Sequence, residues 1–223
     1  MPHLPHLDAL DADGAIRDSA EAAGLDRGDF LKKGVLAGGG LLAGGAMFSG
    51  YLSTAEAAIS KHRSKSNDVK ILNYALTLEF LEAAFYKQAV ANAAFGSSAP
   101  LKAFAETVAD HEAKHVSFLK KALGSAAIKS PTFDFGDTVR DPAKFAATAQ
   151  VLEDTGVSAY LGQVGNLSQR AVLAAAGTIA TIEARHAAWI RDINGISPAP
   201  AAFDVPKSEK AILKAVTGTG FIK

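Results

Sequence analysis

The feature of this 223-residue chain that most constrains its fold is a pattern of glutamate, histidine and tyrosine that occurs twice. The string EAKHVSFL, beginning at Glu112, aligns with EARHAAWI, beginning at Glu183, so each copy contains a Glu-x-x-His. Upstream of each copy lies a Leu-Glu pair, at Glu79 and at Glu153, with a tyrosine seven residues after the glutamate. Two halves of like pattern and spacing predict two similar helix pairs that pack around an approximate two-fold axis.

Helical periodicity accounts for most of the chain after residue 58. Apolar residues recur there at intervals of three and four, and no alternating run of strand length appears. Asn67 is expected to cap the first helix, Gly124 to end the second and Asp141 to cap the third. Four long helices and a short one are predicted at residues 67–95, 100–123, 141–164, 168–193 and 208–216. The fold class is therefore all-α, a four-helix bundle with a long crossover between helices 2 and 3 and a short C-terminal helix.

The composition excludes several classes of protein. The 23 basic and 23 acidic residues balance, whereas a nucleic-acid-binding protein usually carries a basic excess. No cysteine is present, which excludes disulfides, thiolate zinc sites, iron–sulfur clusters and a thiol nucleophile. Any metal ion must therefore be held by imidazole and oxygen ligands.

The repeated glutamates and histidines are suited to holding metal. A Glu and a His three residues apart lie on one face of a helix, and their surroundings here are apolar. Four converging carboxylates would repel one another and take up protons. Two divalent cations would neutralise them, with two neutral imidazoles completing the set. The predicted metal ligands are Glu79, Glu112, His115, Glu153, Glu183 and His186.

This arrangement resembles the ferritin-like di-metal carboxylate superfamily, in which two helices each supply one Glu and two others each supply a Glu-x-x-His. The chain is also similar to exported bacterial ferritin-like proteins related to desiccation-associated proteins, through strings such as LNYALTLEFLEAAFY and AQVLEDTGVSAYLG. The resemblance covers residues 67–193. It implies two iron ions, or two manganese ions, that react with dioxygen or peroxide. Tyr86 and Tyr160 are the candidate catalytic residues, as sources of a proton or an electron.

Three functions are considered on this basis. The first is oxidation of Fe(II) or consumption of dioxygen or peroxide at the di-metal centre. The second is a non-catalytic metal-binding bundle that protects against stress or desiccation. The third is an enzyme similar to manganese catalase. A homo-oligomer is compatible with the sequence, which does not decide assembly.

Several neighbouring residues leave alternatives open. Glu82, three residues after Glu79, could be the ligand in its place, a solvated or bridging residue, or a hydrogen-bond acceptor beside a ligand. Glu79 is preferred as the ligand because it aligns with Glu153 by the seven-residue step to tyrosine. His111 precedes Glu112 and points about 100° away from it, so it is expected on the surface. Tyr86 and Tyr160 either hydrogen-bond ligand carboxylates across the bundle or are ordinary core tyrosines.

Two further pairs are assigned packing roles. Phe118 and Trp189 occupy corresponding positions in the repeat and are expected to pack in the core. Gly156 and Gly162 weaken the third helix but allow close approach of another helix.

The first 57 residues are predicted to be an export signal rather than part of the fold. An uncharged run from Gly34 to Ala55 follows basic residues, and Ala55-Glu56-Ala57 fits a small-x-small cleavage site. The segment RGDFLK at Arg27 resembles the twin-arginine signal, with Gly28 in place of the second arginine. The alternative is an uncleaved membrane anchor or a glycine-rich tail.

The predicted organisation follows from that reading. Residues 1–57 form the leader, residues 58–195 the bundle and residues 196–223 a C-terminal extension. The protein is expected in the periplasm, outside the cell or in the cell envelope, without stable membrane insertion after cleavage. Its expected partners are metal ions and dioxygen or peroxide, and not nucleic acid.

Overall fold

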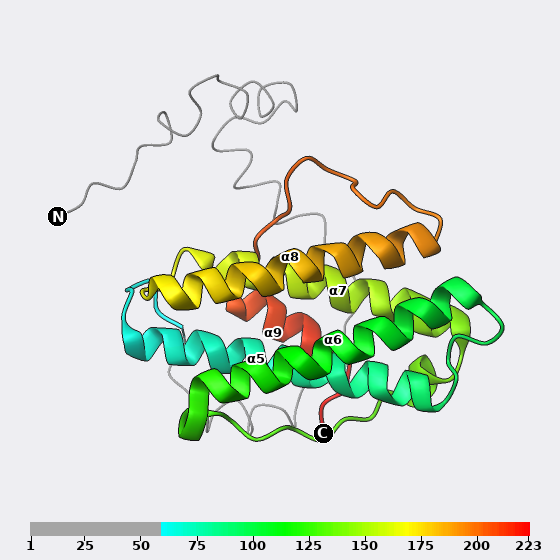
Figure 1. Ribbon diagram of the computed structural model, residues 1–223, viewed down its shortest axis with the longest axis horizontal. Coiled ribbons are helices and arrows are strands. Elements are labelled where there is room, and N and C mark those ends of the chain that lie inside the picture. Colours follow the sequence, from blue (N-terminus) through cyan, green and yellow to red (C-terminus); the bar gives the residue numbers. More distant parts are fainter. Residues whose placement is uncertain (1–58) are drawn as a thin grey trace. The chain divides into compact units, whose positions relative to one another are not determined.

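A computed structural model describes residues 59–223, and within them the secondary structure is helical, with no strand beyond one isolated bridge. The predicted leader, residues 1–57, lies outside the described residues. Four long helices and one short helix lie as Figure 1 labels them. Their bounds are Lys65–Ala91 for α5, Ala99–Leu123 for α6, Pro142–Val164 for α7, Arg170–Ile193 for α8 and Glu209–Gly218 for α9. None of the described helices is both long and apolar enough to cross a membrane.

The long helices form a bundle, which confirms the predicted fold class. α5 packs mainly on α6 and α7 mainly on α8, so each pair joined by a short turn is also a pair in space (Figure 1). The aromatic side chains of Phe85, Tyr86, Phe104 and Phe145 are fully buried at the centre of the larger apolar cluster. Burying such aromatic rings supplies much of the free energy that holds a bundle together.

Helix ends are set by short polar side chains. α5 begins after Ser64, whose Oγ accepts a hydrogen bond from the Asn67 N–H at 3.1 Å. The prediction that Asn67 is the cap is wrong, because the helix starts one turn earlier and Asn67 bonds the Ser60 backbone instead. Gly124 ends α6 and Asp141 caps α7, as predicted.

A buried carboxylate of α5 anchors the start of α8. Asp68 accepts hydrogen bonds from the backbone N–H groups of Ser168 and Gln169, at 2.8 and 2.9 Å. The N-cap residue of α8, Gln169, makes no capping bond of its own. Asp68, which belongs to α5, therefore accepts hydrogen bonds from backbone N–H groups at the beginning of α8. This contact links the α5–α6 pair to the α7–α8 pair.

The crossover from α6 to α7 contains two short 3-10 helices, η1 (Gly124–Ala126) and η2 (Gly136–Val139). The Asn73 side chain bonds the backbone of Ala126 and Ile128. Farther along, Phe133 pairs with Ile222 in an isolated bridge. The crossover thus lies against α5 and against the end of the chain.

Gly162 of α7 is the point where the C-terminal segment crosses the bundle. The Lys207 N–H donates to the Ser158 carbonyl at 3.0 Å. A Cβ built on Gly162 would lie 1.9 Å from the Lys207 carbonyl oxygen, so no side chain fits there. The predicted close approach is therefore made by an irregular segment and not by a helix.

We expect Gly162→Ala to destabilise the protein by about 1–3 kcal/mol, because the Cβ collides with backbone that must shift. Gly177→Ala in α8 is the matched control, since its Cβ meets no atom within 4 Å. That change should stabilise the helix by about 0.5–1 kcal/mol. Urea unfolding of the two variants measures both effects. Equal stability of the two variants would contradict the close crossing at Gly162.

Candidate metal centre

Four carboxylates meet in the middle of the bundle, one from each long helix. Glu112, Glu153 and Glu183 are fully buried, and Glu79 is 1% exposed. Each lies in a central turn of its helix, so packing the four helices side by side brings them to one level. The two histidines of the repeat lie with them, and all six sequence-predicted residues are therefore brought together.

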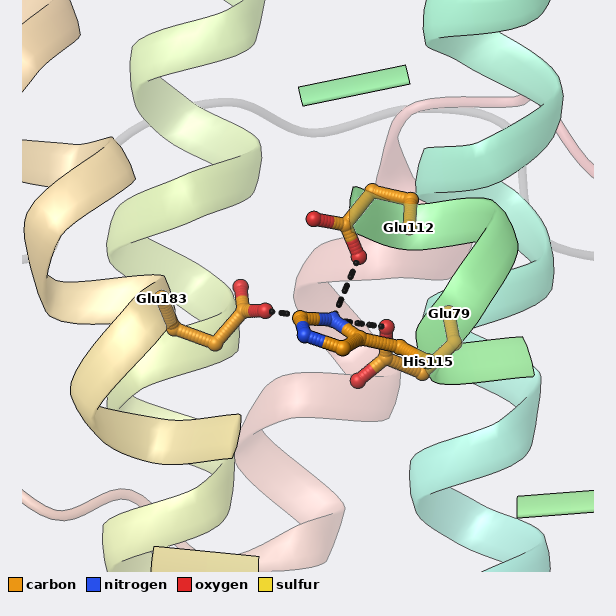
Figure 2. A group of neighbouring side chains, drawn as sticks. All are labelled: Glu79, Glu112, His115 and Glu183. Atoms are coloured by element: carbon orange, nitrogen blue, oxygen red, sulfur yellow. Dashed lines mark hydrogen bonds and ion pairs between the residues drawn. The ribbon is translucent and has the colours of Figure 1, made fainter. Parts of the chain in front are cut away.

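His115 of α6 lies among three of these carboxylates. Its Nδ1 is 3.1 Å from Glu112 Oε2, 3.2 Å from Glu79 Oε2 and 3.3 Å from Glu183 Oε1. Figure 2 shows the ring between Glu183 from α8 on one side and the other two carboxylates on the other. The His115 side chain keeps 13% of its exposure, so this part of the site is the nearest to solvent.

His186 of α8 holds the equivalent place in the other half. Its Nδ1 lies 3.3 Å from Glu112 Oε1 and 3.2 Å from Glu153 Oε2. Glu183 supplies a further oxygen to the same group. Two sets of four residues result, each with ligand atoms within 4.8 Å of one another, and both sets contain Glu112 and Glu183.

Several polar atoms of the cluster lack hydrogen bonds within the described residues. They are Glu112 Oε1, Glu153 Oε2, both carboxylate oxygens of Glu183 and His186 Nδ1. Some lie near one another, yet their geometry is not that of hydrogen bonds. Buried atoms of this kind are costly unless a partner is supplied. A cation between them supplies one, so the residues fit a metal site with oxygen and imidazole ligands.

The pKa values of the cluster residues without metal also indicate that these carboxylates are stabilised by positive charge. Burial, with repulsion between neighbouring carboxylates, raises the pKa of Glu112 and of Glu183 well above its ordinary value. Burial opposes protonation of His115, but its close contacts with the carboxylates of Glu112, Glu183 and Glu79 outweigh burial and raise the pKa of His115 to about 12. Burial acts to raise the pKa of Glu79, but hydrogen bonds with His115 and Glu112 outweigh burial, so the pKa of Glu79 is lowered overall. Without metal, protons supply the positive charge.

The two tyrosines of the repeat form hydrogen bonds from one helix pair to the other. The Tyr86 hydroxyl of α5 donates to Glu153 Oε1 of α7, and the Tyr160 hydroxyl of α7 donates to Glu79 Oε1 of α5. Of the two interpretations left open by the sequence, hydrogen bonding to the carboxylates across the bundle is the one observed. Each tyrosine holds one carboxylate oxygen and leaves the other turned toward a histidine.

Glu82 is a fifth buried carboxylate beside the cluster, at 3% exposure. A Cβ built on Gly156 would lie 2.8 Å from Glu183 Oε2 and 3.4 Å from Glu82 Oε1. The glycine therefore makes room for these two carboxylates and not for a helix backbone. The interpretation of Glu82 as a solvated residue is wrong, because its side chain is buried. Burial and repulsion from Glu183 raise the pKa of Glu82 well above its ordinary value.

His111 is the functional neighbour that the sequence reasoning missed. It is half-buried, and its Nδ1 lies 2.9 Å from His186 Nε2 with the two rings stacked at 5.1 Å. The expectation of a surface histidine is wrong, because α8 covers this face of α6. The signal that was available is the four-residue spacing between His111 and His115, which places them on one helix face.

The His111 contact bears on which ring nitrogen of His186 can offer a lone pair to a metal ion. For Nδ1 of His186 to offer a lone pair to a metal, its proton must sit on Nε2, and His111 Nδ1 is placed to accept it.

We expect His111→Leu to weaken metal binding about 10–100-fold, because His186 loses the partner that orients its ring. His111→Gln, whose carbonyl oxygen can accept the same hydrogen bond, should retain most of the affinity. Titration with Mn(II) by calorimetry measures both. Glu106→Gln, an exposed change on the same helix, is the control and should have no effect. Unchanged affinity in His111→Leu would show that the contact does not position His186.

Of the two packing predictions for Phe118 and Trp189, one is confirmed and one is wrong. Trp189 packs edge-to-face on Phe104 with ring centroids 5.4 Å apart, as expected for a core residue. Phe118 is 46% exposed, so its predicted core role is wrong. The α8 turns opposite it are half-exposed and do not cover it.

Comparison with known proteins agrees with this geometry. The family profile for the ferritin-like domain matches residues 67–195, a range that contains all six residues of the cluster. No protein with curated annotation matches the chain.

Proposed function

The chain belongs to the ferritin-like domain family, and we propose that its bundle binds two iron ions, or two manganese ions, and oxidises Fe(II) or consumes dioxygen or peroxide. The observation that carries this proposal is the pair of overlapping residue sets that share Glu112 and Glu183. A carboxylate common to both sets would be a ligand of both ions and would offset part of the charge of each. Glu79 and His115 would complete one ion's ligands, and Glu153 and His186 the other's.

Charge and ligand type support the same assignment. Four carboxylates offset the charge of two divalent ions, which leaves both imidazoles neutral and able to coordinate. Oxygen and imidazole ligands without thiolate suit iron and manganese. Two Fe(II) ions held there would supply two electrons, enough with two protons to reduce dioxygen to hydrogen peroxide, or hydrogen peroxide to water.

The chain's own residues would manage protons around that chemistry. Tyr86 and Tyr160 each keep a hydroxyl hydrogen on a ligand carboxylate, at Glu153 Oε1 and Glu79 Oε1. Glu82 lies beside Glu183, and burial together with repulsion from Glu183 raises its pKa, which favours its protonated form. These three groups each lie beside a candidate ligand and could donate a proton to the centre.

The test is anaerobic loading with Fe(II), followed by addition of dioxygen. The proposal predicts two Fe(II) bound per chain and a rise in near-ultraviolet absorbance on oxidation. Failure to bind two ions, with no absorbance change on adding dioxygen or peroxide, would overturn it. Two retained ions without oxidation would instead support the protective, non-catalytic function. Release of dioxygen from peroxide by the manganese-loaded protein would support a catalase-like enzyme.

We also propose that the bundle acts outside the cytoplasm, from the sequence of residues 1–57. Small residues before Ala58 and basic residues before the uncharged run support cleavage and export. Mass spectrometry of protein from the cell envelope should find an N-terminus near Ala58. An intact residue 1 in that fraction would contradict cleavage.

A further inference from the structure

One end of the bundle contains a narrow apolar cleft. It lies where α5 and α8 begin and α6 and α7 end (Figure 1). Leu78, Phe118, Ala159, Tyr160, Ala176 and Ile179 are among its walls, so all four long helices contribute. None of the α8 residues from 170 to 178 is buried, and four of them are alanines. The small side chains of this half of α8 leave the bundle interior incompletely filled.

The cleft joins the protein surface to the carboxylate cluster. Phe118 stands at its outer side, 46% exposed. Tyr160 stands at its inner side, and its hydroxyl is hydrogen-bonded to Glu79. The inner end of the cleft is therefore one side chain away from the candidate metal ligands.

The size of the void restricts what it can hold. Its volume is about 20 Å³, slightly more than the roughly 10–15 Å³ that a single water molecule requires. One diatomic molecule fits in such a space. An acyl chain or a metal ion with its hydration shell does not.

The polarity of the walls restricts the occupant further. The polar side chains along the cleft are Tyr74, Tyr160 and Gln163. The last two are engaged with Glu79 and Asn166, and the buried Tyr74 hydroxyl has no partner within the described residues. A buried water needs two to four polar partners. Hydrogen peroxide has two hydroxyl groups, and burying one without a partner costs about 2–7 kcal/mol.

We infer that this cleft is a binding and entry site for dioxygen on its way to the carboxylate cluster. Dioxygen is small, apolar and needs no hydrogen bond, so it gains from an apolar wall that offers water and peroxide few hydrogen-bond partners. The assignment names the oxidant of the function proposed above and rests on that function for its purpose. Occupancy of the cleft by dioxygen does not itself require metal.

The first experiment uses the metal-free full chain under dissolved dioxygen, which is paramagnetic. Methyl relaxation measured by NMR should be enhanced several-fold at Ala159, Ala176 and Ile179 relative to Ala174, an exposed alanine of the same helix. Equal enhancement at all four residues would overturn the inference. This result stands whether or not the protein oxidises iron.

The second experiment fills the cleft. Ala176→Phe should abolish the enhancement at Ala159 and slow Fe(II) oxidation by dioxygen several-fold, while oxidation by hydrogen peroxide keeps its rate. Ala174→Phe, on the exposed side of α8, is the matched control and should change neither rate. Equal slowing of both oxidants by Ala176→Phe would contradict a path reserved for dioxygen. Relaxation enhancement in the cleft with no oxidation in any variant would refute the proposed function alone.

Discussion

The Glu112→Gln variant is expected to lose both metal ions, whereas Glu79→Gln is expected to lose only one. Glu112 belongs to both four-residue sets, while Glu79 belongs only to the set that contains His115. Removing a shared carboxylate takes a ligand and a negative charge from both ions at once. Removing an unshared one leaves the second set intact. Equilibrium dialysis against Mn(II), followed by metal analysis, gives the stoichiometry of each variant.

The other half of the cluster provides an independent repeat of this test. Glu183→Gln should behave like Glu112→Gln, and Glu153→Gln should behave like Glu79→Gln. Glu106→Gln, an exposed change on α6, controls for general effects of losing a carboxylate. The same loss in all four cluster variants would contradict two overlapping sites. Far-ultraviolet circular dichroism of each metal-free variant checks that the bundle has formed.

The metal-free protein should lose stability as the pH rises from about 5 to about 8, and the metal-loaded protein should gain it. Glu112 and Glu183 have folded-state pKa values above the unfolded value of about 4.3. Their protonated forms therefore stabilise the folded state at low pH, and this contribution is lost as the pH rises through the folded pKa.

His115 acts in the same direction over a higher range. Its contribution is complete below the unfolded pKa of about 6.5 and is lost as the pH rises toward its folded pKa of about 12. Glu79, with a lowered pKa, contributes stability that is lost only as the pH falls below about 4.3, outside this window. Between pH 5 and 8 in the absence of metal, Glu82, Glu112, Glu183 and His115 thus favour the lower pH. His111 opposes them, because burial lowers its pKa and its contribution grows as the pH rises.

Metal reverses the sign because it competes with protons for the same atoms. Its affinity rises with pH, and each tenfold rise in affinity adds about 1.4 kcal/mol of stability when the metal is in excess. Thermal unfolding at about pH 5 and pH 8, with chelator and with Mn(II), measures both slopes. A metal-free protein that becomes more stable with rising pH would contradict the electrostatic description of the cluster. Glu112→Gln should flatten the metal-free slope.

The sequence alone predicted the bundle and the members of the cluster. Apolar residues at intervals of three and four define amphipathic helices, and Glu112 with His115 must share a helix face whatever surrounds them. The second Glu-x-x-His, at Glu183 and His186, predicted a matching ligand-bearing face on another helix. Such properties follow from local backbone geometry, which is why residues 141–164 were predicted to be helical and α7 spans Pro142–Val164.

Only the tertiary structure decided which residues of different helices touch. The hydrogen bonds that Tyr86 and Tyr160 make between α5 and α7, and the contact of His111 with His186, depend on the rotation and stagger of packed helices. The crossing at Gly162 depends on the path of the C-terminal segment over α7. The incomplete packing around Phe118 depends on the rotation and stagger of the helices too. Periodicity specifies which face of a helix is buried, but not which atom of another helix it meets. That choice is made by the summed packing of all four helices, which no single segment contains.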